Sequence, residues 1–441
     1  MKTTTLSLSL LTAVCVLAAM AGRPVQAATI TLTAEVDKPL LLAETTQTAY
    51  LRVGLTGCPL ERLKARTPLN VALVIDRSGS MSGEKIGKAK EAAILALHRL
   101  NAEDIVSVVV YDTEAQVLVP ATKMTRRDDI IGKIRQIKPG DTTALYAGVE
   151  TGAQEVEKFQ SLDRVNRIVL LSDGLANVGP KSPQALGKLG ARLAEKGISV
   201  TTIGLGLGYN EDLMSRLAYT SDGGHYFAEE ADELAGVFDE EFGRALSVVA
   251  QQVHIEIICG EGMRPVRVLG RQGMIDGRTV TLDMNHIYSE HEKYVLIEVE
   301  IPGDQAIRPR ELACVRLSYR DMNAETPVKS SHAVEVRFCD SQTDSDKSVN
   351  KRVMADVVEQ LAIERNEQAT ALRDEGKLEE ARQTLKANSV YLRSNADKYA
   401  SPSLKQYAEE NEQAADQLDS ADWTKERKVM RESQSSRKTQ R

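Results

Sequence analysis

Hydrophobic positions change their periodicity three times along the chain, and each change marks a different kind of structure. Between residues 69 and 247, short and nearly continuous apolar runs alternate with segments in which apolar residues recur every three or four positions. The runs indicate strands buried on both faces, and the segments between them indicate amphipathic helices. This alternation predicts an α/β domain with a doubly wound, mostly parallel sheet. The expected strands are Val71–Ile75, Ile105–Tyr111, Val117–Val119, Arg167–Ser172 and Ser199–Leu205.

Short β-rich runs flank this α/β stretch on both sides. In residues 28–68 polar and apolar positions alternate, and in residues 248–340 short apolar runs are separated by turn residues such as Asp276-Gly277. Such runs predict strands with one buried face, packed as a β-sandwich. We expect both flanks to belong to one sandwich into which residues 69–247 are inserted, because domain termini often lie close together.

The pattern becomes helical after residue 340. Val349, Val353, Val357 and Leu361 recur at a spacing of four, and the following residues resemble one tetratricopeptide-like hairpin. A single hairpin is not an array, because about three repeats are needed for stability. Residues 341–420 are therefore predicted to be helices that pack on the sandwich. Residues 421–441 are polar and basic without apolar periodicity, which predicts a disordered tail.

The first 27 residues have the composition of a signal peptide. Lys2 precedes the apolar stretch Leu6–Ala19, and Val25-Gln26-Ala27 fits a small-residue cleavage site. We expect cleavage after Ala27 and a periplasmic or extracellular protein. No later apolar run reaches the roughly 18 residues that a membrane-spanning helix needs. Loss of Lys2 and Arg23 changes the formal net charge from -7 to -9, and this acidic balance argues against nucleic-acid binding.

Candidate chemistry lies directly after the first strand of the α/β stretch. Asp76 ends the apolar run, and Ser78 and Ser80 follow it at a spacing of two. Ligands of open α/β sheets bind at the carboxyl ends of the strands. Since all three side chains offer oxygen atoms, they suit a hard divalent cation better than zinc or copper.

This Asp-x-Ser-x-Ser motif resembles the first part of the metal-ion-dependent adhesion site of von Willebrand factor A domains. That family adds a threonine from a later loop and an aspartate at the end of a later strand. The stretch Gly140–Tyr146 resembles the threonine loop, and Arg167–Gly174 resembles the strand that ends in Ser-Asp-Gly. The resemblance implies metal ligation by Asp76, Ser78, Ser80, Thr143 and Asp173.

The same resemblance implies a function. In that family the bound ion, which we expect to be Mg²⁺ with Mn²⁺ or Ca²⁺ as alternatives, is completed by an aspartate or glutamate carboxylate of a partner protein. The chain is thus expected to act in adhesion, envelope organisation or complex assembly, and not as an enzyme. Ser172 and Asp141 are expected behind or at the rim of the site, and Asp141 stands where the family usually has glycine.

Two other functions remain open from the sequence. A hydrolase could use the ion to activate water, with Asp141 as the candidate general base. Alternatively, the C-terminal helices could bind partners while the α/β domain is structural. Ser82–Lys85 matches the S-x-x-K motif of penicillin-binding proteins, but Ser-Asp-Asn and Lys-Thr-Gly are both absent from the sequence.

The cysteines of the mature chain all lie outside the α/β stretch. An even number in an exported protein allows two disulfides with three possible connectivities. Buried free thiols are the alternative, because cysteine is often simply a core residue. The four residues are Cys58, Cys259, Cys314 and Cys339.

Overall fold

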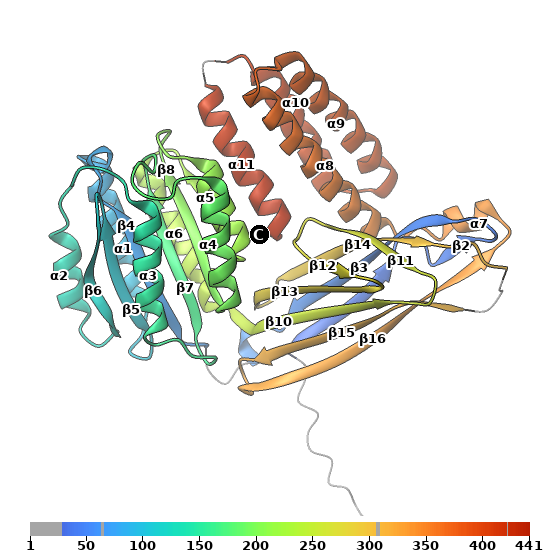
Figure 1. The fold of residues 1–441 in the computed structure, drawn as a ribbon, viewed down its shortest axis with the longest axis horizontal. Coiled ribbons are helices and arrows are strands. Elements are labelled where there is room, and N and C mark those ends of the chain that lie inside the picture. The colour runs from blue at the N-terminus through green and yellow to red at the C-terminus, as the bar shows by residue number, and fades with distance from the viewer. Residues whose placement is uncertain (1–28, 63–65, 306–308, 421) are drawn as a thin grey trace, which may run out of the picture.

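The computed structural model describes residues 29–62, 66–305, 309–420 and 422–441. The chain forms an α/β domain, a β-sandwich and a group of C-terminal helices that contacts both (Figure 1). The predicted signal peptide, residues 1–27, lies outside the described residues. Within the described parts of the chain, no helix is both long enough and apolar enough to span a membrane.

The α/β domain contains a six-stranded sheet in the order β6-β5-β4-β7-β8-β9. Only β6 runs antiparallel to its neighbour, and it lies at one edge. Every residue of β4, β5, β7 and β8 is buried, which confirms the prediction from their apolar runs. The strands are β4 (Leu69–Asp76), β5 (Ile105–Tyr111), β6 (Ala115–Lys123), β7 (Val165–Ser172), β8 (Ile198–Leu205) and β9 (His225–Ala228).

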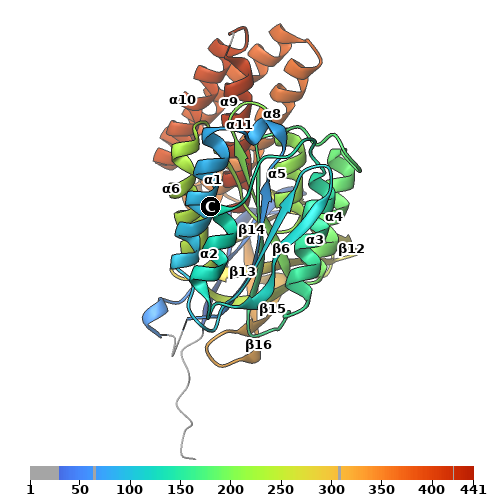
Figure 2. The same ribbon diagram turned by 90° about the vertical axis from the view of Figure 1, so that its left-hand side faces the viewer.

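Helices cover both faces of this sheet, as Figure 2 shows. Each face has its own apolar core, so the predicted doubly wound α/β fold is confirmed. One face carries α1 (Glu84–His98), α2 (Arg127–Arg135) and α6 (Leu234–Leu246). The other carries α3 (Leu145–Glu157), α4 (Pro183–Glu195) and α5 (Glu211–Thr220).

The two flanks of the α/β domain form one sandwich, as the sequence predicts. The N-terminal strand β3 pairs with β14, with Val53 opposite Val295, and β2 pairs with β16. One sheet has the order β1 (Ile30–Val36), β3 (Gln47–Gly57), β14 (Glu292–Ile301), β11 (Arg264–Leu269). The other has the order β12 (Met274–Asp276), β13 (Thr279–Tyr288), β10 (Val248–Cys259), β15 (Arg310–Asp321), β16 (Thr326–Cys339), β2 (Leu40–Leu42).

The C-terminal helices begin on the sandwich. The first turns of α8 place Val353 and Val357 in an apolar cluster with Leu269, Tyr294 and Leu296 of the sandwich. From there α8, α9 and α10 pack side by side. The helices of this region are α7 (Gln342–Lys347), α8 (Lys351–Asp374), α9 (Leu378–Tyr399), α10 (Pro402–Gln417) and α11 (Trp423–Thr439).

The prediction of a disordered tail is wrong. Residues 423–439 form α11, which stands between the α/β domain and α8 to α10 (Figure 1). Its basic side chains are paired rather than solvated: Lys428 is buried against Glu211, and Arg431 bonds to Asp212. Because these partners precede α11 by more than two hundred residues, a search for apolar periodicity does not detect the contact.

Of the two alternatives left open for the cysteines, two disulfides are excluded, because Cys259, Cys314 and Cys339 are free thiols. Strand alternation gives one reason. Ile258 lies opposite Cys314, and Cys259 lies opposite Ala313, so the two cysteine side chains point to opposite faces of their sheet. Burial raises the pKa of the Cys259 thiol to about 11, which makes it an unreactive core residue.

Candidate metal centre

Two aspartates stand at the carboxyl ends of neighbouring strands. Asp76 is the last residue of β4, and Asp173 directly follows β7. These strands are parallel neighbours in which Ile75 lies opposite Leu171, so the two side chains are carried by one edge of the sheet. Both aspartates are almost completely buried.

The carboxylate of Asp76 is held from two sides. Its Oδ1 accepts a hydrogen bond of 2.8 Å from the main-chain N–H of Ser78, and its Oδ2 accepts one of 2.6 Å from Ser172 Oγ. Burial raises the pKa of Asp76 to about 6, although the hydrogen bonds from Ser172 and Ser78 oppose this shift. The carboxyl group therefore has a fixed orientation at the edge, and Ser172 lies behind it.

The two serine hydroxyls link the aspartates. Ser78 stands just before a short 3₁₀ turn, Gly79–Met81, and Ser80 lies within that turn. The two hydroxyl oxygens are 3.1 Å apart, and Ser80 Oγ donates a hydrogen bond of 2.7 Å to Asp173 Oδ1. The Asp-x-Ser-x-Ser motif is thus connected to the aspartate that follows β7.

Thr143 lies close to the two serine hydroxyls, in the space next to Gly174. A β-carbon placed on Gly174 would lie 3.2 Å from Thr143 Oγ1, 3.3 Å from Ser80 Oγ and 3.6 Å from Ser78 Oγ. Three hydroxyl oxygens, one of them from a loop more than sixty residues away, therefore surround one small space. A residue larger than glycine at position 174 would intrude on it.

The threonine loop is held in place by contacts that the sequence did not reveal. Asn177 accepts a hydrogen bond from Thr143 N–H through Oδ1 and donates one from its own N–H to Thr143 O. Its place three residues after Gly174 gave no local signal of this contact, because Thr143 lies more than thirty residues earlier in the chain. On the other side, a β-carbon on Gly140 would lie 2.0 Å from Asp112 Oδ2, so only glycine fits there.

Two charged residues complete the rim. Asp141 is exposed and contributes its main-chain oxygen, which accepts a hydrogen bond of 2.8 Å from Gly79 N–H. Lys85 near the start of α1 places its Nζ 2.5 Å from Asp173 Oδ2. In the sequence Lys85 stands out only as part of S-x-x-K, so this ion pair was not predicted.

The donor set suits a hard divalent cation. It offers two carboxylates and three hydroxyls, all oxygen, which is the chemistry that Mg²⁺ and related ions prefer. Among the described residues, no group of three or more histidines, cysteines, aspartates or glutamates could hold a metal ion by itself. The candidate site agrees with this finding, because only two of its five side chains are carboxylates and the other three are hydroxyls.

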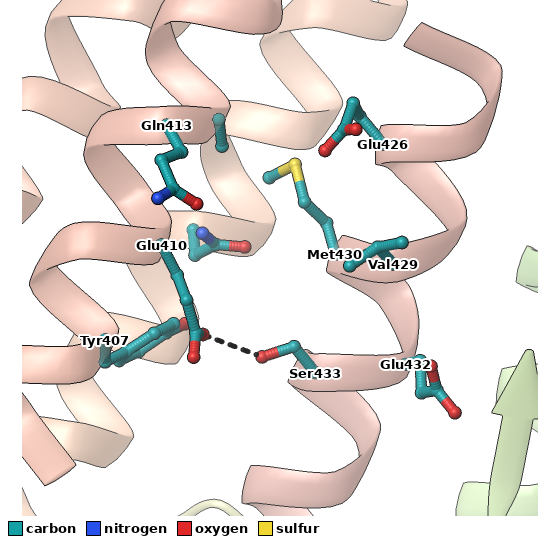
Figure 3. A pocket seen from close by; sticks show the side chains of 10 residues that line it. Tyr407, Glu410, Gln413, Glu426, Val429, Met430, Glu432 and Ser433 are labelled. Atoms are coloured by element: carbon teal, nitrogen blue, oxygen red, sulfur yellow. Dashed lines mark hydrogen bonds between the residues drawn. The ribbon is translucent and has the colours of Figure 1, made fainter. Parts of the chain in front are cut away.

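A second candidate lies among the C-terminal helices. A cavity of about 310 Å³ separates α10 from α11, and Figure 3 shows Glu410 and Ser433 facing each other across it. Glu432 also lines this cavity, where its carboxylate accepts a hydrogen bond from Phe227 N–H and burial raises its pKa to about 7. Glu410 is already paired with Arg437, so this cavity is a weaker candidate for ion binding than the sheet edge.

Comparison with known proteins addresses the sheet edge. Residues 70–240 match the family described as von Willebrand factor type A domain. This chain contains a VWA domain. Domains of this family generally mediate protein–protein interaction or adhesion, and they commonly bind a divalent metal ion. The matched residues include all five candidate metal ligands, Asp76, Ser78, Ser80, Thr143 and Asp173.

One curated relative is similar to less than half of this chain. The uncharacterized protein sll0103 of Synechocystis is 32% identical over 190 residues, which are 43% of this chain and 44% of that protein. The chain spans less than half the length of the first curated relatives that it matches.

Two solved structures share more of the fold. The ArnB paralog VWA2 of Sulfolobus acidocaldarius covers 90% of this chain and 98% of its own, with a TM-score of 0.63 and 18% identity. A von Willebrand factor type A protein of Catenulispora acidiphila covers 85% of this chain and 89% of its own, with a TM-score of 0.69 and 16% identity. At these identities the likeness shows the fold, which includes regions on both sides of the VWA domain.

Proposed function

We propose that this chain is an exported protein that binds a partner protein through a divalent cation held at the edge of its VWA domain. Adhesion, envelope organisation and assembly of a larger complex are the roles that such a surface serves. The observation that carries the proposal is the convergence of three hydroxyl oxygens on the space beside Gly174, next to the buried carboxylates of Asp76 and Asp173.

These residues would hold the ion with a position to spare. Asp76 and Asp173 offset its charge, while Ser78, Ser80 and Thr143 offer neutral oxygens. Mg²⁺ requires near-octahedral coordination by six oxygens and usually keeps some water, so five side chains leave room for an incoming oxygen. A bound cation supplies a concentrated positive charge at the protein surface, which an aspartate or glutamate carboxylate of the partner would neutralise. Mg²⁺ is the proposed ion, with Mn²⁺ or Ca²⁺ as alternatives.

The proposed compartment follows from the sequence. Residues 1–27 have the charged start, apolar stretch and small-residue cleavage site of a signal peptide, which supports a periplasmic or extracellular location. The acidic net charge favours a protein partner over nucleic acid, because nucleic-acid binding surfaces are basic.

A pull-down of envelope proteins with the mature protein tests this proposal. The arms are wild type with Mg²⁺, wild type with excess chelator, and Asp76→Ala with Mg²⁺. Asp232→Ala is the matched control, because Asp232 is 74% exposed and its ion pair is with Lys88 rather than with a candidate metal ligand. We expect a partner that is retained by wild type and by Asp232→Ala in Mg²⁺ and lost in the other two arms.

Retention of the same partner in all arms would contradict the metal bridge. It would instead favour partner binding by the C-terminal helices, where the cavity between α10 and α11 offers another surface. Metal-dependent turnover of phosphoester or peptide substrates by the purified protein would instead favour the hydrolase. Asp141 is a poor general base in this structure, because it is exposed and reaches the site through its main-chain oxygen.

A further inference from the structure

Lys85 lies on a metal-site carboxylate, where a cation already compensates the negative charge. Its Nζ is 2.5 Å from Asp173 Oδ2, while Ser80 Oγ occupies the other oxygen, Oδ1, at 2.7 Å. The Asp173 side chain is fully buried, whereas the Lys85 side chain is 37% exposed. Both oxygens of Asp173 thus have a partner, and one partner is a flexible ammonium group with access to solvent.

A comparison within α1 shows that this placement is specific to Lys85. Lys88 follows one turn later with a similar exposure of 33%, but it pairs with Asp232, which is 74% exposed. An exposed pair of that kind contributes little. A buried carboxylate is costly to leave unpaired, so the contact of Lys85 with Asp173 matters far more.

The loop after β8 leaves space for the ammonium group. Gly206 has a positive φ of 68°, and a β-carbon placed there would lie 3.7 Å from Lys85 Nζ. Two residues later, a β-carbon on Gly208 would lie 2.7 Å from Asp173 O. Glycine at position 208 therefore lets this loop pass close to Asp173, while Gly206 lies within ordinary contact distance of the Lys85 ammonium group.

We propose that Lys85 is a counter-ion belonging to the metal site, and that its ammonium group competes with the divalent cation for Asp173. This inference rests on the proposed function. Without the cation, Lys85 compensates the buried carboxylate and keeps the edge of the sheet folded. When the cation binds, Asp173 exchanges one positive partner for another, so Lys85 lowers the affinity for the ion.

The competition has two consequences of opposite sign. Removing the charge of Lys85 leaves Asp173 without its cation in the metal-free protein, which destabilises that form. The same change removes a positive charge that the incoming cation must displace or approach, and at such short range one unit charge alters an affinity by about tenfold or more. Substitution of a lysine that is exposed and has no role in the metal site would produce neither effect.

The test is isothermal titration of the full mature protein with MgCl₂, combined with thermal unfolding in excess chelator. Lys85→Gln and Lys85→Met remove the charge and keep most of the stem, Lys85→Arg keeps the charge, and Lys88→Gln is the control on the same helix. We expect both neutral variants to bind Mg²⁺ about tenfold more tightly than wild type and to unfold at a lower temperature in chelator. Lys85→Arg and Lys88→Gln should match wild type in both measurements.

Unchanged or weaker Mg²⁺ binding by both neutral variants would overturn the counter-ion role while leaving the proposed function intact. Failure of the wild type to bind Mg²⁺ would overturn the proposed function and this inference together. A tighter Lys88→Gln variant would show a general charge effect, which also contradicts the specific role of Lys85.

Discussion

The metal edge of the VWA domain and the contact of α11 with the rest of the chain both bury charge, but they compensate it differently. Around α11, two buried acids have basic partners: Glu211 contacts Arg427 and Lys428, and Glu241 contacts Arg167 and Arg441. Glu432 of α11 itself differs, because burial raises its pKa to about 7. At the metal edge, Asp76 accepts hydrogen bonds only from neutral groups in the contacts described above, and Asp173 has one half-exposed lysine. An acid that is paired with basic side chains of the same protein stabilises the packing of its elements. An acid whose charge is only partly offset by the protein can still bind a cation from solution.

The same contrast appears in the titration of the two regions. Burial alone would raise the pKa of Glu241, but Arg167 and Arg441 lower it below its ordinary value. Burial also acts on Asp76, and there the opposing hydrogen bonds are too weak, so its pKa rises to about 6. A cation added at the metal edge would therefore offset a buried negative charge that hydrogen bonds alone do not compensate.

The largest expected effect comes from breaking the compensated region. Glu241→Gln removes the carboxylate between Arg167, whose side chain is fully buried, and Arg441, leaving buried cations unpaired. We expect a loss of about 3–5 kcal/mol in the free energy of unfolding, measured by urea denaturation. Asp239→Asn on the same helix is the control, because its pair with Arg99 is exposed and should contribute under about 1 kcal/mol. Equal losses in both variants would contradict the contrast.

A smaller effect is expected where α11 meets the loop after β8. Lys428 is buried and donates to Tyr209 O at 2.8 Å and to Glu211 Oε2 at 2.6 Å. Lys428→Met should lower the free energy of unfolding by about 2 kcal/mol, because Glu211 keeps Arg427. Hydrogen exchange of α11 should accelerate with it. Lys425→Met, which breaks an exposed pair with Glu229, should leave exchange unchanged, and acceleration in both variants would argue against a specific clamp.

At the metal edge, the support behind Asp76 should matter for ion affinity more than for folding. Ser172→Ala removes the hydrogen bond of 2.6 Å to Asp76 Oδ2. Groups that orient a ligand in this way typically contribute about 10–100-fold to metal affinity, and we expect Mg²⁺ binding to weaken by the lower end of that range. Ser199→Ala is the control, because Ser199 is also a buried strand serine but bonds to Asn285. Unaltered affinity in Ser172→Ala would contradict ligation through Asp76.

The pH dependence of Mg²⁺ binding should be the gentlest test. Burial raises the pKa of Asp76 to about 6, and a protonated carboxyl group is a poor ligand. Affinity should be constant above pH 6 and fall by about tenfold for each unit below it, because binding must then release a proton. Titration calorimetry between pH 5 and pH 8 measures this. An affinity that stays constant down to pH 5 would show that Asp76 does not ligate the ion directly.

The fold could be predicted where burial repeats with a regular period. The strands of the α/β domain are apolar at nearly every position because helices cover both faces, and this pattern is visible without any contact information. The insertion into the sandwich also followed from composition, since alternating strands lie on both sides of the α/β stretch. Asp76, Ser78 and Ser80 could also be predicted as ligands from the sequence, because one short motif contains all three. Thr143 and Asp173 needed the family resemblance.

The remaining features depend on contacts that no local pattern encodes. Helix α11 buries Lys428, Gln434 and Thr439 rather than an apolar stripe, so its sequence suggested disorder. Asn177 and Lys85 contact partners on other elements. Single asparagines and lysines are common on any protein surface, so their sequence positions did not reveal these contacts. Cysteine spacing likewise does not show which face of a sheet a cysteine occupies, so it could not exclude a disulfide between Cys259 and Cys314.

A crystal of the mature protein grown with Mn²⁺ would show where the ion binds, through the anomalous difference map at the manganese edge. We expect one strong peak beside Gly174, bounded by the oxygen atoms of Ser78, Ser80 and Thr143 and by the carboxylates of Asp76 and Asp173. The same crystal grown from Asp76→Ala protein should lose that peak. A peak elsewhere, or a peak at the edge that persists in Asp76→Ala, would contradict the assignment of this edge as the metal-binding surface.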